Sequence, residues 1–329
     1  MRALRLPLCL ALILAAVAAI APARAEEIAV GNYAVSANGM PFAVAMAKGY
    51  FKEEGADVTG IITSAGGGTS LRNMLTGTVP YGEVNPAAVI SAIQQGADLK
   101  IISDNVLTVG EFIWAVKPDS PIKSIKDFKG KKIGYTNPKS TSLALGAMLM
   151  EKAGFKAEDA EMVRTGGFGE GVAALDIGLI DIAAIPEPLW SKFKSKYRAV
   201  ATAADSLPPL DNVVGVTTMA QAAAKGDFIR AVIRARRRAV VFMKQNPDEA
   251  GDIVAKTYNI EPEVGRSAVR YLTTVVTDGL PYWGEGDIHL AGLERMVALQ
   301  TSIGAITGTV DLSKIVDTQF LPDDLKAMK

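Results

Sequence analysis

The sequence predicts an α/β protein with two lobes, each a mostly parallel sheet flanked by helices, and a ligand cleft between the lobes. Short apolar runs alternate with helical stretches over most of the first two hundred residues. Repeated strand–helix units require parallel strands joined by right-handed crossovers. A chain of 329 residues also exceeds what one hydrophobic core usually holds, so it is expected to divide.

The predicted strands are short, and a helical stretch follows almost every one of them. Apolar runs that carry this pattern occur at 27–33, 57–63, 79–85, 100–104, 131–136, 161–165 and 181–186. No helical stretch directly follows the run at 100–104. Further along, at 117–132, lies a polar segment rich in Pro and Lys. The chain therefore contains two series of strand–helix units with a break between them.

The breaks in this pattern predict the lobe boundaries. The polar segment 117–132 marks a departure from the first lobe, and a Pro pair precedes another apolar run near residue 213. These features predict a first lobe formed by 26–110 and 213–329, and a second lobe formed by 111–212. Beyond about residue 218 the sequence reads as helices without strands between them, which we expect to pack on the first lobe.

The first 25 residues predict export. Arg2 and Arg5 precede an apolar run at 8–20, and Ala23 and Ala25 form an A-x-A end. This order is typical of a secretory signal peptide cleaved after Ala25, which places the mature chain in the periplasm. The apolar run is shorter than the roughly 20 residues needed to cross a bilayer.

Composition excludes several function classes. The only cysteine, Cys9, lies in the predicted signal peptide, so the exported chain would have no disulfide, thiol nucleophile or thiolate metal site. Loss of that segment leaves a net charge of about −3, which does not favour nucleic acid as a partner. The single histidine, His289, begins a helical pattern and is expected to be a surface or capping residue. We therefore predict no metal and no cofactor.

Small polar residues gather where predicted strands give way to helices. Open α/β sheets bind ligands at this edge, because the first amides of each helix are unpaired and carry partial positive charge. One of Ser140, Thr141 and Ser142 would cap a helix, and the others would face a ligand. Ordinary capping is the alternative at each junction, but the repetition favours a shared cleft. The junctions are 36–41, 64–70, 83–88, 137–142, 165–171 and 185–190.

Four segments resemble the sulfonate/nitrate/taurine-type solute-binding proteins of ABC importers. They read MPFAVAMAKGYFKEEGADV, SLRNMLTGTVPYGEVNPAAVISAIQQGADLKIIS, DSPIKSIKDFKGKKIGYTNPKSTSLALGAMLMEKAGF and EGVAALDIGLIDIAAIPEPLWSK. The resemblance covers roughly residues 27–220. It implies the two-lobed periplasmic binding protein fold of type II, and a receptor that is not an enzyme.

The resemblance also implies a partner and a site. A monomer would bind a small organic anion, a sulfonate or carboxylate with aromatic acids among the options, and deliver it to an ABC permease in the inner membrane. An exported sensory receptor, or an enzyme on the same fold, are the alternatives. The implied ligand contacts are Asn38, Pro41, Gly67, Gly68, Thr69, Asn85, Ser140, Thr141, Phe168 and Glu187.

Two departures from the family pattern concern the cleft walls. The family often has an aspartate where this chain has Tyr81, Gly82 or Glu83, and a tryptophan where it has Ile185 and Pro186. The usual sulfonates are therefore not assumed as ligands. Glu187 has two interpretations at this point: it faces the ligand, or it sits in the first turn of a helix and interacts with the dipole.

Overall fold

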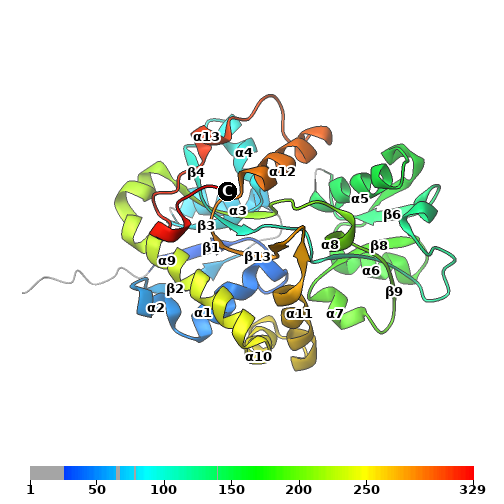
Figure 1. The fold of residues 1–329 in the computed structure, drawn as a ribbon, viewed down its shortest axis with the longest axis horizontal. Coiled ribbons are helices and arrows are strands. Elements are labelled where there is room, and N and C mark those ends of the chain that lie inside the picture. The colour runs from blue at the N-terminus through cyan, green and yellow to red at the C-terminus, as the bar shows by residue number, and fades with distance from the viewer. Residues whose placement is uncertain (1–25, 64–66, 78, 139) are drawn as a thin grey trace, which may run out of the picture.

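The computed structural model describes residues 26–63, 67–77, 79–138 and 140–329. The predicted signal peptide, 1–25, lies outside the described residues. Two sheets with helices on their faces form two lobes that lie side by side (Figure 1). No helix in the described part of the chain is both long enough and apolar enough to span a bilayer.

The first lobe contains a six-stranded sheet in the order β13-β4-β10-β3-β1-β2. Its strands are β1 (Glu26–Val30), β2 (Val58–Ile62), β3 (Gly82–Val84), β4 (Leu99–Val106), β10 (Val213–Thr218) and β13 (Trp283–Gly286). Helices from the first part of the chain are η1 (Ala37–Gly39), α1 (Met40–Ala47), α2 (Tyr50–Glu54), α3 (Gly67–Gly77) and α4 (Pro86–Gln94). Later helices are α9 (Met219–Gln245), α10 (Pro247–Tyr258), α11 (Pro262–Thr274), α12 (Leu290–Ser302), α13 (Leu312–Ile315) and η4 (Asp323–Leu325).

The second lobe contains a five-stranded sheet in the order β7-β6-β8-β5-β9. Its strands are β5 (Phe112–Val116), β6 (Lys132–Tyr135), β7 (Glu161–Arg164), β8 (Ile182–Pro186) and β9 (Arg198–Thr202). Its helices are η2 (Ile125–Phe128), α5 (Thr141–Lys152), η3 (Ala157–Asp159), α6 (Phe168–Asp176), α7 (Leu189–Phe193) and α8 (Ala203–Ser206).

The fold class is as predicted, but both sheets are mixed rather than mostly parallel. β1 pairs in parallel with β2 and β3, and β6 does so with β7 and β8. β10 runs antiparallel to β3 and β4, with Val214 opposite Val84 on one side and Asp104 on the other. β5 likewise opposes β8 and β9. The path of the chain explains these directions. β5 and β10 each follow a crossover from the other lobe and enter their sheet at the edge where the parallel strands end. They therefore run opposite to those strands.

The expectation of helices alone after residue 218 was wrong. β11 (Val276–Thr277) and β12 (Leu280–Pro281) form a small hairpin, whose turn residues Asp278 and Gly279 have positive φ values of 47° and 81°. A two-residue hairpin turn of this kind requires positive φ. β13 then joins β4 as an antiparallel edge strand of the six-stranded sheet.

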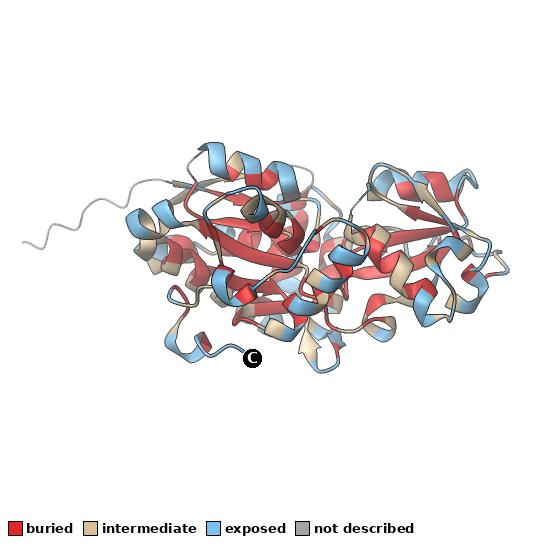
Figure 2. Cartoon of the chain, turned by 90° about the horizontal axis from the view of Figure 1, so that it is seen from above, coloured by how far each residue is buried: buried red, intermediate tan, exposed pale blue. Residues whose placement is uncertain are grey.

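The core of each lobe lies along its strands and the helix faces that cover them (Figure 2). Trp283 is buried in the first lobe and Trp114 in the second. Helix α12 contributes to both cores, because Leu293 packs in the first cluster while Met296 and Leu299 pack in the second. This helix therefore connects the lobes beside the crossover segments.

Candidate ligand-binding site

The carboxyl ends of β1 and β3 meet the start of α3 at one edge of the first sheet. The Gly31 amide donates to the Glu83 carbonyl oxygen at 3.0 Å. A Cβ atom on Gly31 would lie 3.2 Å from Ser70 Oγ, which is a tight contact and shows how closely the end of β1 approaches α3. Three junctions that are separate in the sequence are thus brought together at the edge where such sheets bind ligands.

A buried carboxylate lies beneath this edge. Glu83 is fully buried, and its two oxygens accept hydrogen bonds from Asn38 Nδ2 at 3.1 Å and Asn105 Nδ2 at 2.6 Å. Arg236 Nε lies 3.3 Å from Glu83 Oε2. Burial raises the pKa of Glu83, and Arg236 and the two amides act in the opposite direction. The ion pair and the two amides together compensate the charge that burial would otherwise disfavour.

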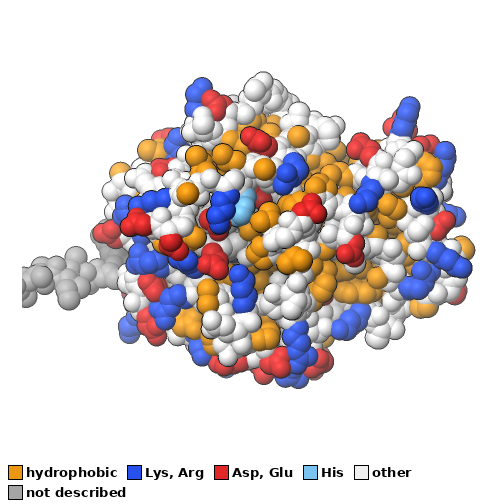
Figure 3. Space-filling view, in the orientation of Figure 1, with side chains coloured by type: hydrophobic (Ala, Val, Ile, Leu, Met, Phe, Trp, Pro, Cys, Tyr) orange, Lys and Arg blue, Asp and Glu red, His pale blue; other side chains and the backbone are white. Residues whose placement is uncertain are grey.

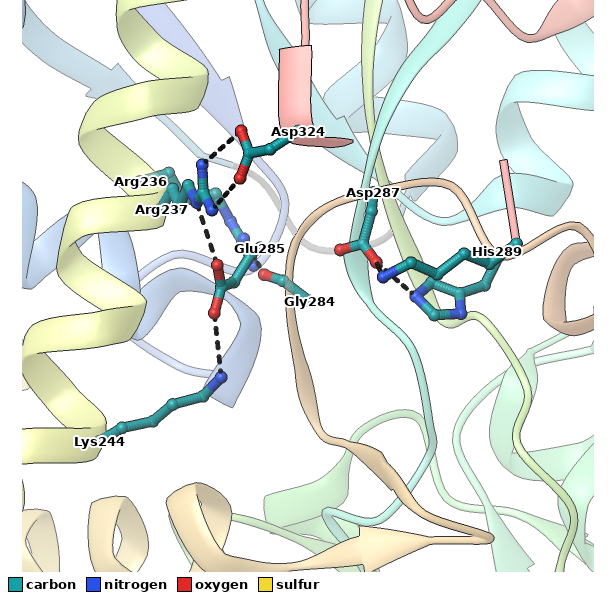
Figure 4. Close-up of polar contacts among 9 residues, drawn as sticks. Arg236, Arg237, Lys244, Gly284, Glu285, Asp287, His289 and Asp324 are labelled. Atoms are coloured by element: carbon teal, nitrogen blue, oxygen red, sulfur yellow. Dashed lines mark hydrogen bonds and ion pairs between the residues drawn. The ribbon is translucent and has the colours of Figure 1, made fainter. Parts of the chain in front are cut away.

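Arg236 is itself held by backbone groups. Its Nη1 donates to the Gly284 carbonyl oxygen at 2.8 Å and its Nη2 to the Asn105 carbonyl oxygen at 2.6 Å. Figure 4 shows Arg236 reaching from α9 toward Gly284 on β13. Asn105 also donates to the Tyr81 hydroxyl at 2.8 Å, and burial raises the pKa of Tyr81 to about 12. The polar floor of the first lobe is therefore cross-linked through three strands, β3, β4 and β13, and helix α9.

Asn85 joins the two lobes. Its side-chain oxygen accepts from the Ala87 amide at 2.8 Å and caps α4. Its Nδ2 donates to Thr141 Oγ1 at 3.2 Å and to the Asn212 carbonyl oxygen at 3.4 Å. The starts of α4 in the first lobe and α5 in the second therefore lie against each other.

The polar run before α5 forms a connected set of hydroxyl groups. Ser140 caps α5 by accepting from the Leu143 amide at 3.3 Å. Ser140 Oγ lies 3.0 Å from Ser142 Oγ, which lies 3.1 Å from Thr136 Oγ1. A single residue caps the helix, and the remaining hydroxyls tie the end of β6 to α5 and to the first lobe.

An aromatic group adjoins these hydroxyls. Helix α6 begins at Phe168 after Gly167, whose N-cap position makes no side-chain capping bond. Phe168 packs edge-on against Phe112 with ring centroids 5.6 Å apart. Thr136, Ser142 and Phe168 line one small hollow of the second lobe. Apolar side chains gather in the region between the lobes, while charged side chains spread over the outer surface of the same face (Figure 3).

Glu187 is buried, and its carboxylate is turned toward α7. Its oxygens accept from the Ser191 amide at 3.1 Å and the Ser191 hydroxyl at 3.0 Å. Burial raises the pKa of Glu187 to about 7. Ser191 Oγ lies 3.0 Å from Ser267 Oγ on α11, and Lys194 Nζ donates to the same Ser267 oxygen at 2.5 Å. Glu187 therefore bonds the first turn of α7 from a position just before the N-cap Pro188, and does not lie in that turn. The Ser191–Ser267 pair forms a second contact between the lobes.

The remaining predicted residues lie in helix starts of the first lobe. Pro41 is buried in the first turn of α1. Gly67, Gly68 and Thr69 form the first turn of α3. The structure thus brings Asn38 to the buried carboxylate and joins Asn85 to Thr141, whereas Glu187 lies at the α7–α11 contact.

Sequence reasoning missed the groups that hold Asn38. Glu83 belonged to a noted junction, but nothing in the sequence paired it with Asn105 or Arg236. Arg234 and Arg238 lie on the outward face of α9, where both form ion pairs with Glu54 of α2. Arg236 lies between them in sequence and points the other way, into the core.

Comparisons with known proteins agree with this architecture. The riboflavin-binding protein RibY of Chloroflexus aurantiacus is 24% identical over 305 residues, which is 86% of this chain and 82% of the relative. The aliphatic sulphonate binding protein SsuA of Escherichia coli superposes with a TM-score of 0.72 at 19% identity, covering 89% of this chain and 92% of that one.

Two further structures share the fold. The periplasmic nitrate-binding protein NrtA of Synechocystis superposes with a TM-score of 0.70 at 12% identity, over 90% of this chain and 86% of that one. The desulfurization enzyme DSZB does so with a TM-score of 0.66 at 14% identity, over 90% and 97%. At these identities the likeness concerns the fold, which is the two-lobed periplasmic binding protein fold. The model of the NMT1/THI5-like family matches residues 36–250, more than half of the chain, and the protein belongs to that family.

Proposed function

We propose that this protein is a periplasmic solute-binding protein that holds a small organic anion, a sulfonate or a carboxylate, between its lobes and delivers it to an ABC-type importer. Proteins of the same fold include sulfonate- and nitrate-binding proteins, and a relative in sequence binds riboflavin. The export segment predicted at 1–25 fits the same compartment. An exported sensory receptor would use the same cleft.

The observation that carries the proposal is the bond between Asn85 and Thr141. It brings the start of α4 in one lobe to the start of α5 in the other. Helix starts present unpaired amides and partial positive charge, and both features favour an anionic group. A solute held there would touch both lobes, so only the closed arrangement would satisfy every contact.

A small number of hydrogen bonds between protein and solute would give useful affinity. A charge-assisted hydrogen bond contributes roughly 1.5–3 kcal/mol, and a micromolar Kd corresponds to about 8 kcal/mol. Four or five such contacts reach this range after the costs of association. Amides and hydroxyls can therefore hold the anion without a buried cation in direct contact with it.

A binding role is favoured over catalysis, although an enzyme shares the fold. The single histidine of the sequence, His289, hydrogen-bonds Asp287 at 2.9 Å near β13 (Figure 4). It is the N-cap residue of α12. Neither residue belongs to the α4–α5 junction.

The test is solute binding by the mature chain, measured by calorimetry against sulfonates and carboxylates. Ser140→Ala with Thr141→Ala should weaken binding at least several-fold, and loss of the α5 cap should lower the stability of the free protein by about 0.5–2 kcal/mol without unfolding it. The control is Thr301→Ala with Ser302→Ala, a matched pair at the end of α12 that should bind as the parent does. Unchanged affinity in the first variant refutes this placement of the site. Loss of solute uptake on deletion of the gene separates import from sensing.

A further inference from the structure

The side-chain amide of Asn38 has both of its hydrogens committed. Its Nδ2 donates to the Gly31 carbonyl oxygen at 3.0 Å and to Glu83 Oε1 at 3.1 Å. An asparagine side chain has two donor hydrogens and one carbonyl acceptor. These two bonds therefore leave only the carbonyl oxygen to interact with anything else.

The orientation of this amide follows from the charge behind it. Glu83 pairs with Arg236 and accepts from two amides, so its carboxylate is an acceptor at both oxygens. An amide oxygen placed against it would be repelled, so Nδ2 must face Glu83. A flip of Asn38 would also break the bond to Gly31, whose carbonyl can only accept.

The donors that are paired in the rest of the network are directed at groups other than the Asn38 carbonyl oxygen. Asn105 Nδ2 donates to Glu83 and to the Tyr81 hydroxyl. The two terminal nitrogens of Arg236 donate to backbone carbonyls. Tyr258, which lies next to the η1 turn, donates its hydroxyl to the Ser36 carbonyl at 2.8 Å.

The Asn38 carbonyl oxygen accepts no hydrogen bond from a described residue, since both recorded bonds of the side chain are made by Nδ2. Asn38 is largely buried, with 7% of its surface exposed. Asn38 lies in η1, immediately before α1 and bonded to the end of β1. That is the edge of the first sheet at which the proposed site lies.

We infer that the Glu83–Arg236 pair fixes Asn38 as an acceptor-only position of the ligand site, so that the preferred solute carries an N–H or O–H donor in addition to its anionic group. This inference rests on the proposed function and narrows its ligand class. Asn38 would contact the solute, and Glu83 and Arg236 would be positioning residues. An analogue that lacks the donor would leave a desolvated carbonyl oxygen unpaired, which corresponds to a loss of about tenfold or more in affinity.

The experiment compares acids in which a hydroxyl donor is replaced by a methyl ether, which can accept a hydrogen bond but not donate one. The probes are 4-hydroxybenzoate with 4-methoxybenzoate, and 2-hydroxyethanesulfonate with 2-methoxyethanesulfonate, titrated into the mature protein. The parent should prefer the hydroxyl member of at least one pair about tenfold or more. In Glu83→Gln with Arg236→Met, residue 83 can donate as well as accept, so only the Gly31 carbonyl oxygen still opposes a flip of Asn38, and the preference should fall to within about threefold.

The matched control is Glu53→Gln with Arg238→Met, which removes an exposed ion pair of 2.6 Å from the same helix α9. It should keep the parent's preference. The inference is overturned if the parent binds hydroxyl and methoxy acids equally, or if the Glu83 and Arg236 variant keeps the parent's preference. Either result leaves anion binding itself intact.

A second measurement does not depend on the choice of acid. If none of the four acids binds, the proposed function is refuted for this class of anions. Hydrogen exchange of the Asn38 side-chain amide, followed by NMR, then tests the inference. Both amide protons should exchange at least tenfold more slowly in the parent than in the Glu83 and Arg236 variant. Equal exchange rates overturn it.

Discussion

Replacing Arg236 by methionine removes the counter-ion of a buried carboxylate while keeping most of the side-chain volume. Arg236 and Glu83 have side-chain exposures of 2% and 0%, so solvent screens neither charge. The substitution also leaves the Gly284 and Asn105 carbonyl oxygens without their donors. Breaking one side of a buried ion pair costs about 3–5 kcal/mol, and we expect a loss of about 4 kcal/mol in the free energy of unfolding.

The double variant separates the charge effect from the packing effect. Arg236→Met with Glu83→Gln leaves no uncompensated charge, so it should lose no more than about 2 kcal/mol. Urea unfolding followed by tryptophan fluorescence suits this test, because Trp283 is buried on β13 beside Gly284. A loss below about 1 kcal/mol in Arg236→Met, or losses that simply add in the double variant, would refute the argument.

Three further predictions concern the segments that join the lobes. Asp104 and Asp211 are both buried, and burial raises the pKa of each carboxyl group, that of Asp211 to about 7. Their protonated forms stabilise the fold fully below about pH 4, and this contribution is lost as the pH rises to 7. Urea titrations over that range should therefore show Asp104→Asn gaining stability relative to the parent. Gly292→Ala should lose about 1–3 kcal/mol by thermal unfolding, since its Cβ would lie 2.2 Å from Asp211 Oδ1; an unchanged midpoint would contradict the packing. Ser267→Ala removes the oxygen that Lys194 and the second lobe contact, and small-angle scattering should show a larger radius of gyration for the free protein; an identical radius would show that this contact does not hold the lobes together.

Strand–helix alternation was enough to predict the fold class. Apolar runs followed by junctions of small, polar or proline residues correspond to β1, β2, β3, β6, β7 and β8, each of which leads into a helix. Capping is a local property, so the cap at Ser140 could be expected from its place before an apolar helix.

The features that escaped prediction depend on contacts between distant segments. β13 is a short edge strand with two glycines, and its pairing with β4 is visible only once the sheet exists. The burial of Arg236 depends on the facing Glu83, which is 153 positions away in the sequence. The direction of β5 and β10 depends on where the chain crosses between the lobes, and apolar periodicity carries no information on that path.

The most direct test of the central claim is a crystal structure of the mature protein grown with the tightest-binding acid from the titrations. We expect electron density for a solute that touches Asn38 in the first lobe and the Ser140–Thr141 turn in the second. Density confined to one lobe, or located away from the α4 and α5 starts, would contradict it.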